Sequence, residues 1–105
     1  MTVHEYFHHP RRDELVLLDV RDSEERRKGR YVAGSLHVPM TEVLAGEEFG
    51  AREDTPLVVL CERGGRAEIV TRYLRARGYG DVHKLEGGYR ELHQYVRGGE
   101  LTIPE

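Results

Sequence analysis

The sequence contains one cysteine, Cys61, which begins the segment Cys-Glu-Arg-Gly-Gly-Arg. Gly64 and Gly65 permit backbone conformations that direct several successive N–H groups at one point, so this segment is predicted to form an anion-binding loop. The beginning of the helix expected after it, together with Arg63 and Arg66, adds positive charge. Because these surroundings favour the thiolate over the thiol, we expect Cys61 to be a reactive nucleophile.

Glu62 follows Cys61 directly and would oppose ionisation of the thiol if its carboxylate faced the sulfur. We therefore expect this carboxylate to point outward, while the N–H group of Glu62 serves the loop. A cysteine at the end of a strand can also be a small buried residue without a chemical role. Packing alone does not require a loop rich in glycine and arginine at this place, so we favour the chemical interpretation.

Other kinds of site have weaker support. A cysteine hydrolase needs a histidine base beside the thiol, and nothing in the spacing of His37, His83 and His93 singles one of them out. A nucleotide-binding P-loop requires a Gly-Lys pair, which the sequence lacks. A helical arrangement could let the N-terminal histidines bind a metal, but a surface cluster of this kind is more often solvated, and we expect no metal site. These histidines are His4, His8 and His9.

The pattern of apolar residues indicates the elements that position Cys61. Continuous apolar runs predict buried strands of a parallel sheet at residues 15–20, 57–60 and 82–85, with a brief further strand within 34–39. Helical patterns predict helices at residues 24–28, 41–44, 67–77 and 89–96. The charges of the first of these helices are interpreted as a solvated face. Cys61 therefore lies in a turn that connects a buried strand to a helix.

Strands that alternate with helices require right-handed crossovers and a mostly parallel sheet. We predict an α/β fold in which a small, mostly parallel sheet is flanked by helices on both faces. The 105 residues suffice for one domain, which we expect to span residues 1–105, with residues 1–12 as a short N-terminal segment. Ligands of such folds bind beyond the carboxyl ends of the strands, and Cys61 is expected at this edge.

Composition and charge argue against several classes of function. A net charge of -3 gives no reason to expect binding to nucleic acid. No apolar stretch has the length of a membrane span or the form of a signal sequence, so we expect no membrane partner and a cytoplasmic location. A single cysteine forms neither an internal disulfide nor a Cys-x-x-Cys pair of zinc ligands.

Four parts of the sequence together resemble the rhodanese-like sulfurtransferases, specifically the single-domain members of that family. They are Leu-Leu-Asp-Val-Arg at 17–21 with Glu25, the segments Ala-Gly-Ser at 33–35 and His-Val-Pro at 37–39, the cysteine loop, and Leu-Glu-Gly-Gly-Tyr at 85–89. The resemblance extends from about residue 15 to residue 104, which is most of the chain. It implies the rhodanese-like version of the predicted α/β fold.

The resemblance also implies a reaction, that of a thiosulfate sulfurtransferase. Cys61 would take a sulfane sulfur from a small anionic donor such as thiosulfate, become a persulfide, and yield the sulfur to cyanide, a thiol or a protein acceptor. The loop N–H groups would stabilise the anionic persulfide, and Arg63 and Arg66 would attract the donor. No metal or organic cofactor is needed. The substrate-binding residues implied in this way are Glu62, Arg63, Gly64, Gly65, Arg66 and Ala67.

Asp19 and Arg21 match the strand-end pair of the family, and we interpret them as structural support for the neighbouring loops. Two alternatives to the sulfurtransferase reaction are considered. The domain could be a low-turnover module that binds a protein partner or carries sulfur, although the intact cysteine loop argues against an inactive site. Related phosphatases and arsenate reductases have a loop one residue longer, with room for a tetrahedral oxyanion, and the shorter loop here argues against that chemistry.

Overall fold

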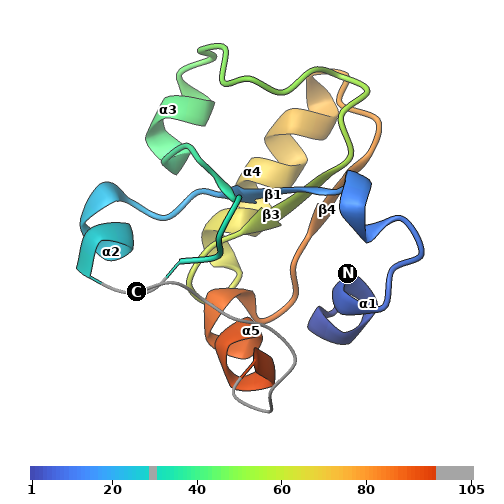
Figure 1. Cartoon of the computed structure of the whole chain (residues 1–105). Helices are drawn as coiled ribbons and strands as arrows, with labels where there is room; N and C mark the ends of the chain where they lie inside the picture. Colours follow the sequence, from blue (N-terminus) through green and yellow to red (C-terminus); the bar gives the residue numbers. More distant parts are fainter. Residues whose placement is uncertain (29–30, 97–105) are drawn as a thin grey trace.

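A parallel sheet forms the centre of the molecule over residues 1–28 and 31–96, the part of the chain that the computed structural model describes (Figure 1). Its strands are β1 Val16–Asp19, β2 Leu36–His37, β3 Leu57–Leu60 and β4 Val82–Lys84, arranged in the order β2-β1-β3-β4. Each neighbouring pair is parallel, as the alternation of strands and helices predicts. β3 pairs with both β1 and β4, so the strand that precedes Cys61 is an interior strand.

Helices cover both faces of this sheet. The described helices are α1 Val3–Phe7, α2 Ser23–Lys28, α3 Met40–Leu44, α4 Gly65–Ala76 and α5 Gly88–Val96, and a short 3-10 turn occupies Arg12–Glu14. α1 and α5 contribute buried residues to one core, while α3 and α4 contribute to the core on the other side of the sheet. The predicted architecture of a parallel sheet between two helical layers is therefore confirmed.

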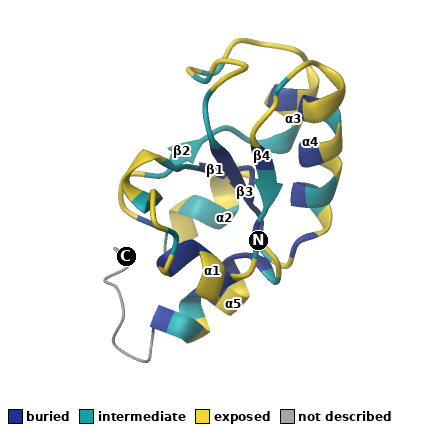
Figure 2. Cartoon of the chain, turned by 90° about the vertical axis from the view of Figure 1, so that its right-hand side faces the viewer, coloured by how far each residue is buried: buried dark blue, intermediate teal, exposed yellow. Residues whose placement is uncertain are grey.

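Alternation along β3 supplies both cores from one strand. Val58 and Leu60 join the core with α1 and α5, whereas Leu57 and Val59 join the core with α3 and α4. All four side chains are fully buried, and burial of such a side chain contributes about 1.5–3 kcal/mol relative to exposure. Figure 2 shows the buried strands enclosed by helices whose outer sides are exposed. The four apolar residues that predict this strand therefore also hold it between the two cores.

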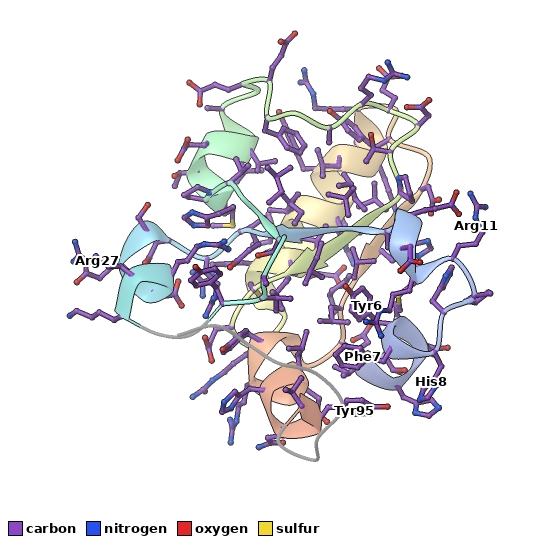
Figure 3. All side chains as sticks on the ribbon, viewed as in Figure 1. Tyr6, Phe7, His8, Arg11, Arg27 and Tyr95 are labelled. Atoms are coloured by element: carbon purple, nitrogen blue, oxygen red, sulfur yellow. The ribbon has the colours of Figure 1, made fainter. Side chains whose placement is uncertain are left out.

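The N-terminal segment contains a helix that the sequence analysis does not predict. α1 begins with a capping box, in which the side chains of Thr2 and Glu5 each accept a hydrogen bond from the backbone N–H of the other. Phe7 stacks on Tyr95 of α5, with ring centroids 4.8 Å apart (Figure 3). A helix of five residues is unstable alone, so this packing against α5 is what maintains it.

The remaining helices agree with the prediction to within two residues at their starts. α2 begins at Ser23, α3 at Met40 and α4 at Gly65. Within the described ranges, no helix combines the length and the apolar character needed to cross a membrane. Residues 97–104, into which the family resemblance extends, lie outside the described part of the chain.

The start of α5 docks directly onto the backbone of the cysteine loop. The N–H of Tyr89 donates to the carbonyl of Cys61 at 2.7 Å, and the N–H of Arg90 donates to the carbonyl of Glu62 at 3.1 Å. Gly88 makes this close approach possible. It has a φ of 64°, and a Cβ atom there would lie 2.5 Å from the carbonyl oxygen of Cys61.

Replacing Gly88 with alanine is therefore expected to destabilise the protein. The added methyl group would overlap two loop carbonyls in a backbone region that disfavours side chains, so we expect Gly88→Ala to lower the free energy of unfolding by about 2 kcal/mol or more. Denaturant titration of both proteins measures this loss. Gly80→Ala is the matched control, because a Cβ at Gly80 meets nothing within 4 Å. Equal stability of the two variants would contradict the proposed close contact.

Candidate active site

The sulfur of Cys61 is buried at the carboxyl end of β3 and faces two backbone donors. Cys61 is 1% exposed, and its Sγ accepts hydrogen bonds from the N–H of Gly64 at 3.0 Å and from the N–H of Ala67 at 3.3 Å. Gly64 has a φ of 118° and is the residue before the first turn of α4. The loop and the start of α4 thus converge on one sulfur atom, as their glycine-rich sequence predicts.

Only some of the loop N–H groups that are predicted to face the sulfur donate hydrogen bonds to it. Of the N–H groups of residues 62–67, those of Gly64 and Ala67 donate to Sγ within the described structure. Both distances are compatible with sulfur as the acceptor, which is larger than oxygen. These two donors stabilise a negatively charged sulfur through oriented dipoles that need no rearrangement.

Arg66 is held by a carboxylate from a different element. Its Nη1 lies 2.5 Å from Oε1 of Glu25 and its Nη2 lies 2.8 Å from Oε2, so the two planar groups form a double hydrogen bond. Both side chains are about one third exposed or less. The hydrogen bonds from Arg66 lower the pKa of Glu25 to about 2, and Glu25 in turn raises the pKa of Arg66. Arg66 therefore ties the cysteine loop to α2.

The interpretation of α2 as a solvated charged face is wrong for two of its residues. Glu25 binds Arg66, and Nη1 of Arg26 lies 3.0 Å from Oδ2 of the buried Asp19. The helix begins beside the active loop, so its inner side chains reach the loop and the end of β1. The solvated interpretation is confirmed for the outer charges, which are more than half exposed and pair with one another: Glu24, Arg27 and Lys28. Figure 3 shows Arg27 projecting away from the molecule.

Asp19 and Arg21 form a buried ion pair at the end of β1. The two side chains are 0% and 2% exposed, and Nη2 of Arg21 lies 3.1 Å from Oδ2 of Asp19. The Arg21 guanidinium lies over the ring of Tyr89, 4.2 Å from its centroid, and its Nη1 lies 3.4 Å from Oε1 of Glu62. Arg21 thereby connects β1, the start of α5 and the cysteine loop.

The surroundings of Glu62 explain how an acidic residue is accommodated beside the sulfur. Its carboxylate is 39% exposed and lies against Arg21 rather than projecting freely into solvent. The opposite charge of Arg21 offsets its repulsion toward an anionic sulfur. Its carbonyl accepts the hydrogen bond from Arg90, so both its side chain and its backbone are fixed.

Arg63 is the exposed cation of the loop. Within the described residues it forms no ion pair and no side-chain hydrogen bond, unlike Arg66 and Arg21. It borders an open hollow of about 350 Å³ in front of the sulfur, lined by Glu25, Cys61, Glu62, Arg63, Gly65 and Arg66. A small anion that enters this hollow meets a positive charge that no described carboxylate pairs with, beside the nucleophile.

The histidines considered from the sequence do not form a catalytic pair with Cys61. Nε2 of His37 lies 2.8 Å from the carbonyl oxygen of Arg21, and Nε2 of His83 lies 2.9 Å from Oδ1 of Asp81. His93 stacks on Tyr89 with a centroid distance of 5.9 Å. Over residues 1–28 and 31–96, no group of three or more histidine, cysteine or acidic side chains is arranged to hold a metal.

The sequence alone does not indicate a role for two residues of the site, Arg26 and Tyr89. Tyr89 belongs to the segment at 85–89, but its position under the Arg21 guanidinium depends on how α5 packs. Arg26 is one of several consecutive charges in α2, and only the helical period distinguishes the inner positions from the outer ones. Glu25 and Arg26 follow Asp22 by three and four residues, so the helical period places both on the side of α2 that carries Asp22.

Comparisons with known proteins agree with this geometry. A rhodanese-like domain model matches residues 2–95. A rhodanese-related protein from Thermoplasma volcanium has a similar structure, with 21% identity, a TM-score of 0.77 and coverage of 90% of each chain. The human single-domain sulfurtransferase TSTD1 is 25% identical, with a TM-score of 0.75 and coverage of 90% of this chain and 94% of the human one.

A third similar structure is part of a larger enzyme. An NAD-dependent persulfide reductase from A. fulgidus is 35% identical over 71% of this chain, with a TM-score of 0.60, and the match covers 13% of that enzyme. The family model covers nearly the whole described chain and includes the cysteine loop, the Asp19–Arg21 pair and the start of α5. The chain therefore belongs to the rhodanese-like domain family.

Proposed function

We propose that the protein is a sulfurtransferase that moves sulfane sulfur from thiosulfate or another persulfide donor to a thiophilic acceptor through a persulfide on Cys61. The observation that carries this proposal is the buried Sγ, which accepts two backbone hydrogen bonds beside Arg63 and its hollow. This arrangement suits a nucleophile that is anionic both before and after it receives sulfur. The similarity to a single-domain sulfurtransferase supports the proposal.

The first step of the proposed reaction loads the enzyme. The Cys61 thiolate attacks the outer sulfur of thiosulfate, a new S–S bond forms, and the S–S bond within thiosulfate breaks. Sulfite leaves with the electron pair of the broken bond, so the cysteine becomes an anionic persulfide. In this proposal the N–H groups of Gly64 and Ala67, which donate to Sγ, stabilise the attacking thiolate, and the N–H groups of the loop stabilise the persulfide that forms.

The second step returns the cysteine to its starting state. A nucleophilic acceptor such as cyanide, a thiol or a protein thiol attacks the outer sulfur, and the thiolate of Cys61 leaves with the electron pair of the S–S bond. The two steps balance without an external oxidant or reductant. We therefore propose that the reaction uses no metal and no organic cofactor. The cytoplasmic location expected from the sequence stays a prediction.

The two arginines of the loop are proposed to have different roles. Arg63 lies at the rim of the hollow without an ion pair to the described residues, so it recruits the anionic donor. Arg66 has its charge largely matched by Glu25, so its main contribution is to hold the loop in the conformation that directs N–H groups at the sulfur. Arg66 is in this sense a positioning residue.

The persulfide can be tested directly by intact mass. After incubation with thiosulfate, the wild-type protein is expected to gain the mass of one sulfur atom at Cys61, and cyanide should remove it. Cys61→Ser is the control, since its hydroxyl is a far weaker nucleophile than a thiolate and should gain nothing. Absence of the gain with thiosulfate and with other persulfide donors would contradict the sulfurtransferase proposal and favour a protein-binding module.

Donor recruitment by Arg63 predicts a change in KM. We expect Arg63→Ala to raise the KM for thiosulfate by roughly three- to tenfold with little change in kcat, and added salt should reduce the difference. Arg63→Lys should keep most of the affinity, and Arg11→Ala is a control at an exposed arginine outside the hollow. Arg66→Ala should lower kcat as well, because the loop loses its tie to α2. Unchanged thiosulfate kinetics in both alanine variants would refute these roles.

The tie between Arg66 and Glu25 should be sensitive to acid. The pKa of Glu25 is lowered to about 2 from an ordinary value of 4.5, mainly by hydrogen bonding to Arg66, so its carboxylate stabilises the folded state above about pH 4.5. This stabilisation is lost as the pH falls toward 2. We expect Glu25→Gln to reduce the free energy of unfolding at pH 7 by on the order of 1–3 kcal/mol.

Denaturant titrations at several pH values provide the measurement. The difference between wild type and Glu25→Gln should be constant at neutral pH and should shrink between pH 4.5 and pH 2, because protonation then removes the charge from the wild-type residue too. Glu24→Gln is the control on the same helix, with a side chain 54% exposed, and should change stability little. A pH-independent loss in Glu25→Gln would show that the ion pair is not its source.

A further inference from the structure

One hollow in the described part of the chain lies away from Cys61 and has no place in the proposed reaction. It has a volume of about 930 Å³ and is lined by residues 46–54, which precede β3, and by the end of α4 with Tyr79 beyond it. Cys61 follows the last residue of β3, whereas the loop at 46–54 precedes the first residue of that strand. The length of β3, about 13 Å, therefore separates the hollow from Cys61. In Figure 1 the loop runs across the top of the molecule, above α3 and α4. We call this hollow the acidic groove.

Aromatic side chains form part of the surface of the acidic groove. Phe49 and Tyr79 stack with centroids 6.1 Å apart, and Tyr73 lies beside them on α4. All three are partly buried, so a portion of each ring faces the hollow. Partly exposed aromatic faces attract both apolar side chains and cations.

The charges around the groove are unbalanced. Four carboxylates line it, against the two arginines Arg52 and Arg77. Arg52 is paired with Asp54 at 3.4 Å, and the guanidinium of Arg77 lies 5.4 Å from the centroid of the Tyr73 ring. Within the described residues, the other three carboxylates form no ion pair, and all three are exposed: Glu47, Glu48 and Glu53.

Hydrogen bonds fix the two walls of the groove, which are the loop at 46–54 and the segment that follows α4. The hydroxyl of Tyr79 donates to the carbonyl of Ala51 at 3.4 Å, and the N–H of Gly80 donates to the carbonyl of Glu53 at 3.2 Å. Thr55 and Arg52 close a turn within the loop through two further hydrogen bonds. A ligand would therefore enter a largely formed site rather than order the loop.

Two exposed apolar residues lie on the helices next to the groove. Leu44 at the end of α3 is 38% exposed and Ile69 of α4 is 50% exposed, and they are the large hydrophobic residues exposed in the described structure. Ile69 lies one helical turn before Tyr73 on the same side of α4. The groove and these two residues together offer aromatic and aliphatic groups near exposed carboxylates.

From these features we infer that the acidic groove is a docking site for a basic, amphipathic segment of a partner protein. An arginine or lysine of the segment would lie on the aromatic faces and near the three exposed carboxylates, while its apolar side chains would cover Leu44 and Ile69. The net charge of -3 makes a second copy of this chain a less complementary occupant than a basic partner. Because the groove is remote from Cys61, a docked partner leaves the sulfur accessible.

The test uses a defined probe, an acetylated and amidated heptapeptide of arginine and leucine, titrated into the isotope-labelled 105-residue chain. Amide chemical-shift changes are expected to concentrate at residues 43–54 and 69–79, with a Kd on the order of 0.1–1 mM. The same peptide with glutamate in place of arginine should produce no such changes. Changes centred on the Cys61 loop or on α5, or no changes at all, would overturn the inference.

Matched variants identify the groups responsible. The triple variant of Glu47→Gln, Glu48→Gln and Glu53→Gln should weaken peptide binding by about tenfold, since each exposed ion pair contributes a fraction of a kcal/mol to about 1 kcal/mol. Glu86→Gln combined with Glu91→Gln removes one exposed carboxylate before α5 and one within it, and should leave the affinity unchanged. Tyr73→Ser, a second variant at the groove, should also weaken binding. Unchanged affinity in the triple and Tyr73 variants would refute the site.

Two further measurements distinguish a docking site for a protein segment from a site for small cations and from the active site. N-acetyl-arginine amide should bind far more weakly than the peptide, and equal affinity would show that the groove takes a small cation rather than a protein segment. Thiosulfate-dependent sulfur transfer should be the same in all groove variants as in wild type, so this inference and the proposed reaction can fail independently.

Discussion

The hydrogen bonds that two backbone N–H groups donate to the buried sulfur of Cys61 are the interaction on which much of this structure depends. Two backbone N–H groups reach Sγ of Cys61 because Gly64 adopts a left-handed conformation and α4 begins directly after it. That geometry depends in turn on β3, which fixes where the loop starts. The strand is fully buried between the two cores, so close packing on both of its faces fixes the position of the sulfur.

Ion pairs from several elements reinforce the same loop from outside. α2 reaches it through Glu25 and Arg66, and β1 reaches it through Arg21 and Glu62. Buried or half-buried charges of this kind are costly unless paired, and each of these is paired with a residue distant in sequence. The pairs therefore act as cross-links between chain segments that are distant in sequence. Among the described residues Arg63 stands outside this network, which leaves its charge available to solutes.

Much of the fold follows from local sequence, and the network of charges does not. The apolar run at 57–60 is long enough and uniform enough to predict a buried strand, and the glycines after it predict a loop around the cysteine. The pairing of Glu25 with Arg66 depends on how α2 is oriented over the loop, which no local pattern specifies. α1 falls between these cases. Its capping residues Thr2 and Glu5 are visible in the sequence, but only packing on α5 makes so short a helix stable.

The docking of α5 on the loop has a consequence for how the loop can change in length. The carbonyls of Cys61 and Glu62 are both occupied by N–H groups at the start of α5, and Gly88 leaves no free space between them. A residue inserted into the loop would move these carbonyls, so the hydrogen bonds from Tyr89 and Arg90 would be kept only if the start of α5 moved as well. The length of the loop and the position of α5 are therefore coupled, and a change in one requires a compensating change in the other.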